Sequence, residues 1–419
     1  MDKKERIQSV EFWRFAFTIL VAIYHFGIFF ISPEKLMPSG TAAVEFFFIL
    51  AGFTLAMSAK RRYETNGQQN LSARDAFSCA NRFVIQKIKA IFPIMLIALA
   101  FHFIVLSGGK PLTALKALMN SEWELMLMVG TPLGYNNGAA PIVPLWFLTQ
   151  LLVVGYAYTF FIGRNYYGMR FAAPITAVLG YIFFTLNSQN ILDFYVPMWI
   201  FNAGTVHAIA EMAMGIALFG LYDYMSKKKF KLYAVILMSL AEVYAIIRYG
   251  MLTFHAPLAL ENFKRILYIM IIILFAFLGK TYLSKLLNKT VSRLLGKISL
   301  TMYLVHFTVG SLYFTLLYAV KQWAVDNISK NPMAGTYLMA LQDTGGYDMR
   351  FRPIPMSVTD AVLYLLLVLI ISLALQCLLA LIRLAVRRIK QAVMHAQERK
   401  SLPLRNDGAD SGNDYDRRD

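Results

Sequence analysis

Ten long apolar runs follow one another along this chain and restrict what it can fold into. A helix that crosses a bilayer needs about 20 mostly apolar residues, because the hydrocarbon core is about 30 Å thick. Only helices and closed barrels satisfy their backbone polar groups there. Of the 419 residues, 58% are hydrophobic and 16% charged, and the mean hydropathy is +0.53. The sequence therefore predicts an all-α fold, a polytopic membrane bundle of about ten transmembrane helices. The predicted spans cover residues 12–31, 41–59, 88–107, 144–163, 170–187, 206–224, 231–250, 264–282, 298–320 and 358–386.

The charged residues between these runs predict the topology. The net charge is +17, and the basic residues gather in alternate connections, such as residues 60–90 and the segment "SKKKFK". Cytoplasmic loops carry an excess of Lys and Arg, so this alternation predicts that both termini are cytoplasmic. It also explains the positive charge without a nucleic-acid partner. Residues 1–390 are predicted to form one transmembrane domain in contact with the lipid bilayer. Residues 391–419 are predicted to be a polar, disordered cytoplasmic tail.

The shorter apolar segments and the cysteines give little information about fold or function. Two short apolar patches, Trp123–Val129 and Val196–Phe201, are predicted to be interfacial or re-entrant pieces. The two cysteines, Cys79 and Cys377, show no spacing typical of a metal site or a disulfide.

Two ionisable residues in the first predicted span stand out, Arg14 and His25. They are eleven residues apart, which is close to three whole turns, so both side chains point the same way about 16 Å apart along the axis. Ionisable groups within a membrane span are costly and tend to be functional. Two structural interpretations compete with a functional one: Arg14 as a residue reaching to the cytoplasmic surface, and His25 as a helix-packing histidine.

Two further spans supply matching groups. His306 lies about ten residues into the ninth span, a depth similar to that of His25, and Glu45 lies near the start of the second. Histidine acts as a general base near neutral pH, and a carboxylate can orient it. We therefore predict a catalytic group of His25, Arg14, His306 and Glu45. A zinc site formed by His25, His306 and Glu45 is geometrically conceivable, but no element carries ligand spacing, so no metal is predicted.

Four motifs in order then resemble the acyltransferase-3 family: Arg-x10-His in the first span, "VEFFFILAGF" in the second, "PLWFL" at 144–148 and "SLTMYLVH" at 299–306. The resemblance extends from about residue 7 to 385. Members of that family are membrane-bound O-acyltransferases that modify cell-surface glycans and related molecules. The resemblance implies transfer of an acyl group, most often acetyl, from coenzyme A to a sugar hydroxyl at a bacterial inner membrane. It assigns an essential role to Arg14 and His25.

The resemblance also suggests where substrates bind. We expect His25 to be the general base on the acceptor hydroxyl and Arg14 to bind the phosphates of the acyl-CoA donor or to balance the charge of the site. Arg82, Lys87 and Lys89 are further candidates for binding coenzyme A, and an ordinary positive-inside loop explains them equally well. Trp146 and Tyr303 are candidates for lining the acceptor cavity, although aromatics near helix ends also serve as interface or packing residues.

Some positions depart from the family pattern. The segment "PLWFLTQLL" lacks the glutamate that many members carry there, and His207 stands where relatives often have arginine. Roles for Gln150 and His207 are therefore not carried over. His102 and His255 fall near the predicted outer surface and receive no role.

Two other classes of function remain open. A transporter or flippase for a lipid-linked glycan or acylated metabolite would use intramembrane Arg, Glu and His for proton coupling. Such proteins are expected to show broken spans in two related halves, and no such pairing is found in the sequence. A membrane sensor built on the same scaffold is the third class. The sequence leaves open the acceptor, the acyl group and whether the chain forms a homo-oligomer.

Overall fold

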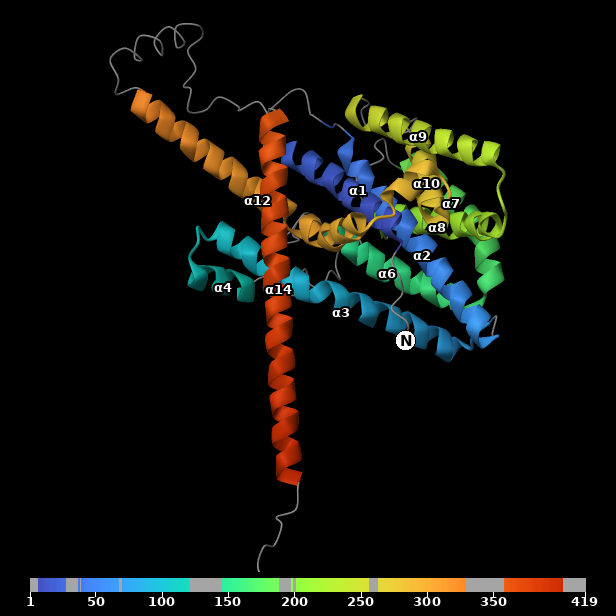
Figure 1. Ribbon diagram of the computed structural model, residues 1–419, viewed down its shortest axis with the longest axis horizontal. Helices are drawn as coiled ribbons and strands as arrows, with labels where there is room; N and C mark the ends of the chain where they lie inside the picture. The colour runs from blue at the N-terminus through green and yellow to red at the C-terminus, as the bar shows by residue number, and fades with distance from the viewer. Residues whose placement is uncertain are drawn as a thin grey trace, which may run out of the picture.

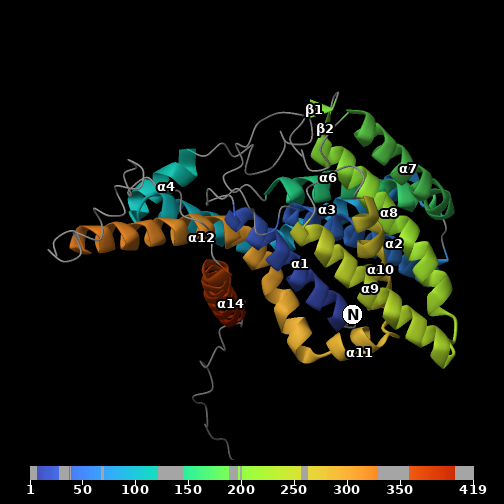
Figure 2. The same ribbon diagram turned by 90° about the horizontal axis from the view of Figure 1, so that it is seen from above.

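Helices make up nearly all of the part of the chain that the computed structural model describes (Figures 1 and 2). The structure describes residues 7–27, 37, 39–67, 70–120, 145–187, 197–198, 201–255, 263–328 and 358–401. The helices are α1 (Gln8–Phe26), η2 (Gly40–Ala42), α2 (Ala43–Asn66), α3 (Ala73–Leu106), α4 (Pro111–Asn120), α6 (Leu145–Arg164), α7 (Tyr166–Asn187), α8 (Ala203–Ser226), α9 (Leu232–His255), α10 (Lys264–Leu278), α11 (Tyr282–Leu287), α12 (Thr290–Ile328) and α14 (Val358–Ser401).

The prediction of a membrane helix bundle is confirmed. Each of the ten predicted spans overlaps a helix, and eight of the described helices are long and apolar enough to cross a membrane. Two helices within predicted spans fall short of this. In α1, Glu11, Arg14 and His25 lower the hydropathy, and α10 is too short because it has only 15 residues. A 15-residue helix is only about 22 Å long. The chain is a multi-pass membrane protein, while the count of ten and the cytoplasmic placement of the termini stay predictions.

The basic segment at residues 60–90 is mostly helical, where the sequence analysis expected a loop. The helix α2 continues to Asn66, and α3 begins at Ala73, so only a short connection separates them. The side chain of Ser72 caps α3 by accepting a hydrogen bond from the Asp75 backbone N–H. Long basic side chains favour helix, which explains why both helices extend beyond their apolar runs. The candidates Arg82, Lys87 and Lys89 therefore lie on α3.

Two other boundaries differ from the predictions. The helix α14 continues to Ser401, past the predicted domain end at residue 390, and residues 402–419 lie outside the described part. The apolar patch Trp123–Val129 also lies outside it. Within the second patch, β1 (Pro197–Met198) pairs antiparallel with β2 (Phe201–Asn202). The Asn202 side chain then accepts a hydrogen bond from the Thr205 backbone N–H and caps α8.

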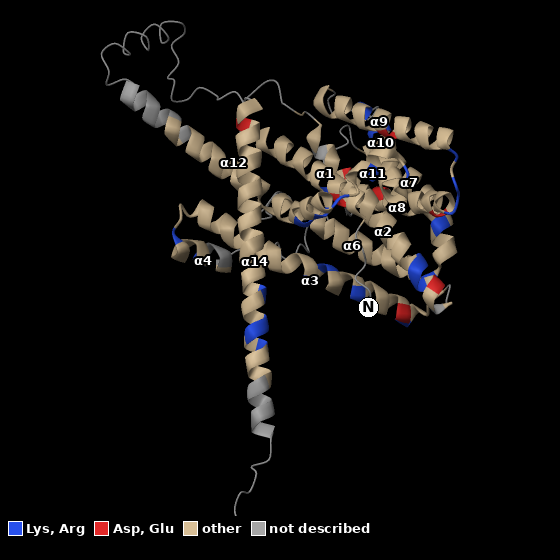
Figure 3. Cartoon of the chain, in the orientation of Figure 1, with Lys and Arg blue, Asp and Glu red and all other residues tan. Residues whose placement is uncertain are grey.

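Charged side chains are unevenly placed in the bundle. Figure 3 shows Lys and Arg at the C-terminal end of α2, along the first half of α3, between α8 and α9, and in the lower half of α14. The upper half of α14 is almost entirely apolar. Clusters of this kind at helix ends are what the positive-inside rule describes for the cytoplasmic face.

Large apolar side chains cover the outside of the bundle. The helix α14 lies at one edge, across α12 (Figures 1 and 2), and exposes Leu363, Leu366 and Ile370 by 49–62%. The helices α7 and α9 also expose many aliphatic and aromatic residues. An apolar surface of this extent is suited to the hydrocarbon core of a bilayer.

Two glycines permit the close crossing of α2 and α8. A Cβ at Gly215 would overlap the Ile49 carbonyl oxygen, and a Cβ at Gly52 would overlap the Met212 carbonyl oxygen. Small residues allow membrane helices to approach to backbone contact, where van der Waals packing drives association. This crossing fixes Glu45 of α2 next to the first turns of α8.

The crossing gives a prediction for stability. Gly215→Ala should lower the stability of the detergent-solubilised protein by about 1–3 kcal/mol, because two backbones would have to separate. Gly250→Ala is the matched control, since nothing lies within 4 Å of the added methyl group. There the greater helix propensity of alanine should leave stability unchanged or raised by up to about 1 kcal/mol. Thermal unfolding followed by size-exclusion chromatography measures both variants, and equal melting temperatures would contradict the packing argument.

Candidate active site

The histidines of two helices meet inside the bundle. Nε2 of His306 on α12 lies 3.0 Å from Nδ1 of His25 on α1, and the ring centroids are 5.0 Å apart. His306 is completely buried, whereas His25 is half-buried. The prediction from depth alone, that these two imidazoles lie at a similar level, is consistent with this contact. His25 is the more exposed ring of the pair.

Backbone carbonyls fix which nitrogens carry the protons. His306 Nδ1 lies 2.7 Å from the Tyr303 carbonyl oxygen, and His25 Nδ1 lies 3.0 Å from the Val21 carbonyl oxygen. A carbonyl oxygen only accepts hydrogen bonds, so both neutral rings are assigned the proton on Nδ1. His25 Nδ1–H is then shared between Val21 and His306 Nε2, which accepts. The Nε2 atom of His25 keeps an unprotonated lone pair, as a general base requires.

A tyrosine holds the backbones behind this pair. The Tyr364 hydroxyl on α14 lies 3.2 Å from the Ala22 carbonyl oxygen of α1 and 3.0 Å from the His306 carbonyl oxygen of α12. Its ring stacks on Phe26, with centroids 4.0 Å apart. One buried side chain thus links α1, α12 and α14 at the level of the histidines.

Arg14 forms an ion pair within α1. Its Nη1 atom lies 3.1 and 2.9 Å from the two carboxylate oxygens of Glu11, whose side chain is 8% exposed. Glu11 packs on Gly296 of α12, where a Cβ would overlap the carboxylate. From the contact Glu11–Gly296 to the contact His25–His306 the residue numbers rise along both helices, so α1 and α12 run parallel. Arg14 and His25 therefore face the same neighbouring helix, as their spacing predicts.

The candidate donor-binding cations divide into two groups. Lys87 is half-buried over the Phe83 ring, 5.5 Å from its centroid, and lies close enough to Arg14 for their charges to repel. Arg82 and Lys89 are exposed. Arg82 lines an open surface cavity of about 550 Å³ on α3 together with Arg74 and Asn81. Only Lys87 of the three is brought near Arg14.

Trp146 and Tyr303 belong to one buried aromatic cluster. Tyr303 lies with its ring centroid 5.8 Å from that of His306 and 5.7 Å from that of Phe147. Phe48 links Phe147 to Trp146, with centroid distances of 4.6 and 6.1 Å. Trp146 and Tyr303 are only 6% and 5% exposed. The cluster forms a wall beside His306, and an acceptor-lining role for its members stays a prediction.

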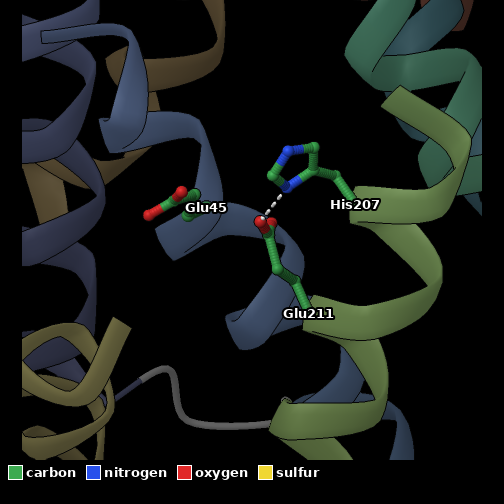
Figure 4. A group of neighbouring side chains, drawn as sticks. All are labelled: Glu45, His207 and Glu211. Carbon is green, nitrogen blue, oxygen red and sulfur yellow. Dashed lines mark hydrogen bonds and ion pairs between the residues drawn. The ribbon is translucent and has the colours of Figure 1, made fainter. Parts of the chain in front are cut away.

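Glu45 lies in a different buried cluster from the histidine pair. Its electrostatic neighbours among the described residues are Glu211, His207 and Arg265. Figure 4 shows Glu45 on α2 beside His207 and Glu211 on α8, and His207 Nδ1 lies 2.8 Å from Glu211 Oε1. On α2 it is Phe47 whose ring approaches Tyr303, at 6.3 Å. Residues 45 and 47 are about 200° apart around a helix, so Glu45 faces away from that ring.

Sequence reasoning gave no role to three residues that the structure places in these clusters. Glu11, three residues before Arg14, and Glu211, four residues after His207, are acidic residues at helical spacing from a basic one. An i,i+3 or i,i+4 pair of this kind inside an apolar run is a readable signal. Arg265 is fully buried near the start of α10 and donates a hydrogen bond to Ser39 Oγ at 3.1 Å.

The other histidines have ordinary surroundings. Nδ1 of His102 lies 2.9 Å from Thr308 Oγ1 in a buried contact between α3 and α12, and His255 is exposed at the end of α9. Gln150 lies in a separate buried contact between α6 and α8, where its Oε1 accepts a hydrogen bond from the Thr205 hydroxyl at 3.0 Å.

Comparison with known proteins places the chain in a family. A family model described as an acyltransferase domain matches residues 7–381. The chain belongs to the acyltransferase 3 family. Neither a curated protein nor a solved structure matches it significantly. The match extends from the start of α1 into α14, so the histidine pair and Arg14 all lie within the acyltransferase domain.

The pair gives a prediction for this acyltransferase. His306→Ala should reduce acyl transfer about tenfold or more, because His25 would lose one of the two acceptors for its Nδ1–H and keep only the Val21 carbonyl. His306→Gln should keep more activity, since its amide oxygen can accept the same hydrogen bond. His102→Ala is the control for removing a buried histidine next to α12 and should leave the rate nearly unchanged. Rates are measured in membranes at equal protein abundance, and equal losses in His306→Ala and His102→Ala would mean that His306 acts only through packing.

Proposed function

We propose that this acyltransferase moves an acyl group, most simply acetyl, from coenzyme A to a hydroxyl of a cell-surface polysaccharide, lipopolysaccharide or related glycan. The membrane in question would be a bacterial inner membrane. The observation that carries the proposal is the contact of His25 with His306, which leaves Nε2 of the more exposed ring as a base. Acyl transfer to a hydroxyl needs such a base, because an alcohol is a weak nucleophile until its proton is removed.

The reaction follows from the assigned protons. His25 Nε2 takes the proton of the acceptor hydroxyl as its oxygen attacks the thioester carbonyl carbon. The new C–O bond forms, the C–S bond breaks, and the thiolate of coenzyme A leaves and takes the proton from His25 Nε2. While His25 is positively charged, its Nδ1–H donates to Val21 and His306. These acceptors stabilise the imidazolium inside a low-dielectric bundle.

The donor end is proposed at Arg14. The distance along α1 from Arg14 to His25 is about 16 Å, which separates a phosphate-binding cation from the base. An arginine binds phosphate through several hydrogen bonds, and Lys87 adds a second positive charge nearby. In the absence of donor, Glu11 balances Arg14. Binding of a phosphate at Arg14 would therefore weaken the ion pair with Glu11.

The acceptor and the acyl group are tested together in cells. Surface glycans from cells with the wild-type chain, with His25→Ala, or with no chain are analysed by mass spectrometry for base-labile acyl groups. We expect the acyl mass only with wild type, because His25→Ala removes the base, and membrane abundance of the variant is measured in parallel. The mass difference identifies the acyl group.

Two results would contradict parts of this proposal. Identical glycans in all three cells would exclude a surface glycan as the acceptor. An acyl mass that persists in His25→Ala at unchanged abundance would exclude His25 as the base.

The donor site gives a separate prediction. Arg14→Gln should raise KM for acyl-CoA about tenfold or more, since a charge-assisted hydrogen bond contributes about 1.5–3 kcal/mol. Arg82→Gln is the control, because Arg82 is exposed in the cavity on α3. Initial rates at varied acyl-CoA concentration separate KM from kcat. A larger rise of KM in Arg82→Gln would place the donor phosphates in that cavity instead.

A further inference from the structure

A second polar cluster lies between α2 and α8 and has no part in the proposed acyl transfer. It contains Glu45, His207 and Glu211, which are 2%, 1% and 0% exposed. Each offers one potential ligand atom, and the three atoms lie within 4.8 Å of one another. Figure 4 shows that one member comes from α2 and the other two from successive turns of α8. Such a set of one imidazole and two carboxylates matches the ligands of zinc sites.

Two carboxylate oxygens of the cluster lack hydrogen bonds. Oε2 of Glu45 and Oε2 of Glu211 are fully buried and receive none from the described residues. A buried polar atom without a partner is costly, and a buried charge more so. Both oxygens belong to side chains at least 98% buried in the cluster. They are atoms through which an ion could be bound.

The charges of the buried side chains also favour a bound cation in this cluster. Arg265 is the buried cation that acts on Glu45, and it also donates to Ser39 Oγ at 3.1 Å. One guanidinium acts on Glu45, so two ionised carboxylates leave the cluster with a net negative charge. A proton on His207 would supply a positive charge but would leave both Oε2 atoms without a hydrogen bond, because His207 Nδ1 faces Glu211 Oε1. A divalent ion matches the two negative charges of the carboxylates and engages their oxygens as well.

We propose that Glu45, His207 and Glu211 bind a divalent transition-metal ion, for which Zn²⁺ is the best fit. His207 Nδ1 and Glu211 Oε1 are 2.8 Å apart, a separation that two ligands of one ion can have. Ligand atoms around tetrahedral zinc lie about 3.4 Å apart, and the three atoms here lie within 4.8 Å of one another, so small side-chain shifts would close the site around an ion. Ligation through Nδ1 requires the neutral ring with its proton on Nε2, so a neutral His207 changes tautomer and a doubly protonated one releases a single proton.

The position of the site indicates what the ion does. Glu45 and Phe47 are about 200° apart on α2, and Phe47 faces the ring of Tyr303 beside His306. The ion therefore lies on the other side of α2 from the histidine pair. It connects α2 to α8 directly above the crossing at Gly52 and Gly215. Its expected effect is to stabilise this helix pair, independently of the proposed acyl transfer.

The experiment measures bound metal on the full-length chain. The protein is purified in detergent with a tag that contains no histidine, stripped with a chelator, and incubated with Zn²⁺ before removal of free metal. We expect one zinc per chain by plasma mass spectrometry and a melting temperature that rises with zinc concentration, because the ion binds the folded state. Co²⁺ in place of Zn²⁺ should give visible absorption bands of a low-coordinate site.

Variants then identify the ligands. His207→Gln and Glu211→Gln should each lower the bound zinc about tenfold or more and abolish the melting shift, whereas His102→Gln should keep both. No zinc above the buffer level in wild type, or zinc content unchanged in His207→Gln and Glu211→Gln, would overturn the proposal. If either variant fails to fold, the wild-type comparison with and without zinc still decides, because absence of a melting shift overturns it.

Discussion

Parallel packing of α1 against α12 sets the position of the groups from which the proposed chemistry is built. Glu11 rests on Gly296 at one end of the contact, and His25 meets His306 at the other. A change of register by one residue would rotate the α1 side chains by about 100° and separate the two rings. Burial of His306 and the carbonyls of Val21 and Tyr303 then decide the tautomers. The proposed role of His25 as a base therefore depends on the alignment of α1 with α12.

The bundle accommodates its buried charges in pairs of helical neighbours and across helices. Arg14 and Glu11 compensate each other within one turn of α1, and Lys60 of α2 pairs with Asp223 of α8. A buried pair contributes little net stability, but removing one partner leaves an isolated charge that is very costly. The pair between α2 and α8 therefore restricts which helices can lie side by side, while the close crossings at glycines determine how near they come.

The sequence predicts the elements of this fold better than their contacts. Apolar runs locate the ten helices, because length and hydropathy are properties of a single segment. The rise per residue likewise predicts that His25 and His306 share a depth. The sequence does not indicate the direction in which Glu45 faces, because this depends on the rotation of α2 against α8 and α12. Phe47 approaches Tyr303, and Glu45 joins His207 and Glu211. The sequence also predicts helix ends poorly, since α2 and α3 extend into a segment whose charge suggested a loop.

Tyr364 makes the order of synthesis relevant to the histidine pair. Translation proceeds from α1 to α14, so His25 is synthesised well before His306. The hydroxyl that links the backbones of Ala22 and His306 belongs to α14, which is synthesised after both. Until that helix has inserted, α1 and α12 lack their shared support, and the stacking of Phe26 on Tyr364 is missing. A nascent chain released before α14 would therefore hold both histidines in the membrane without the hydrogen bonds and the ring stacking that Tyr364 provides.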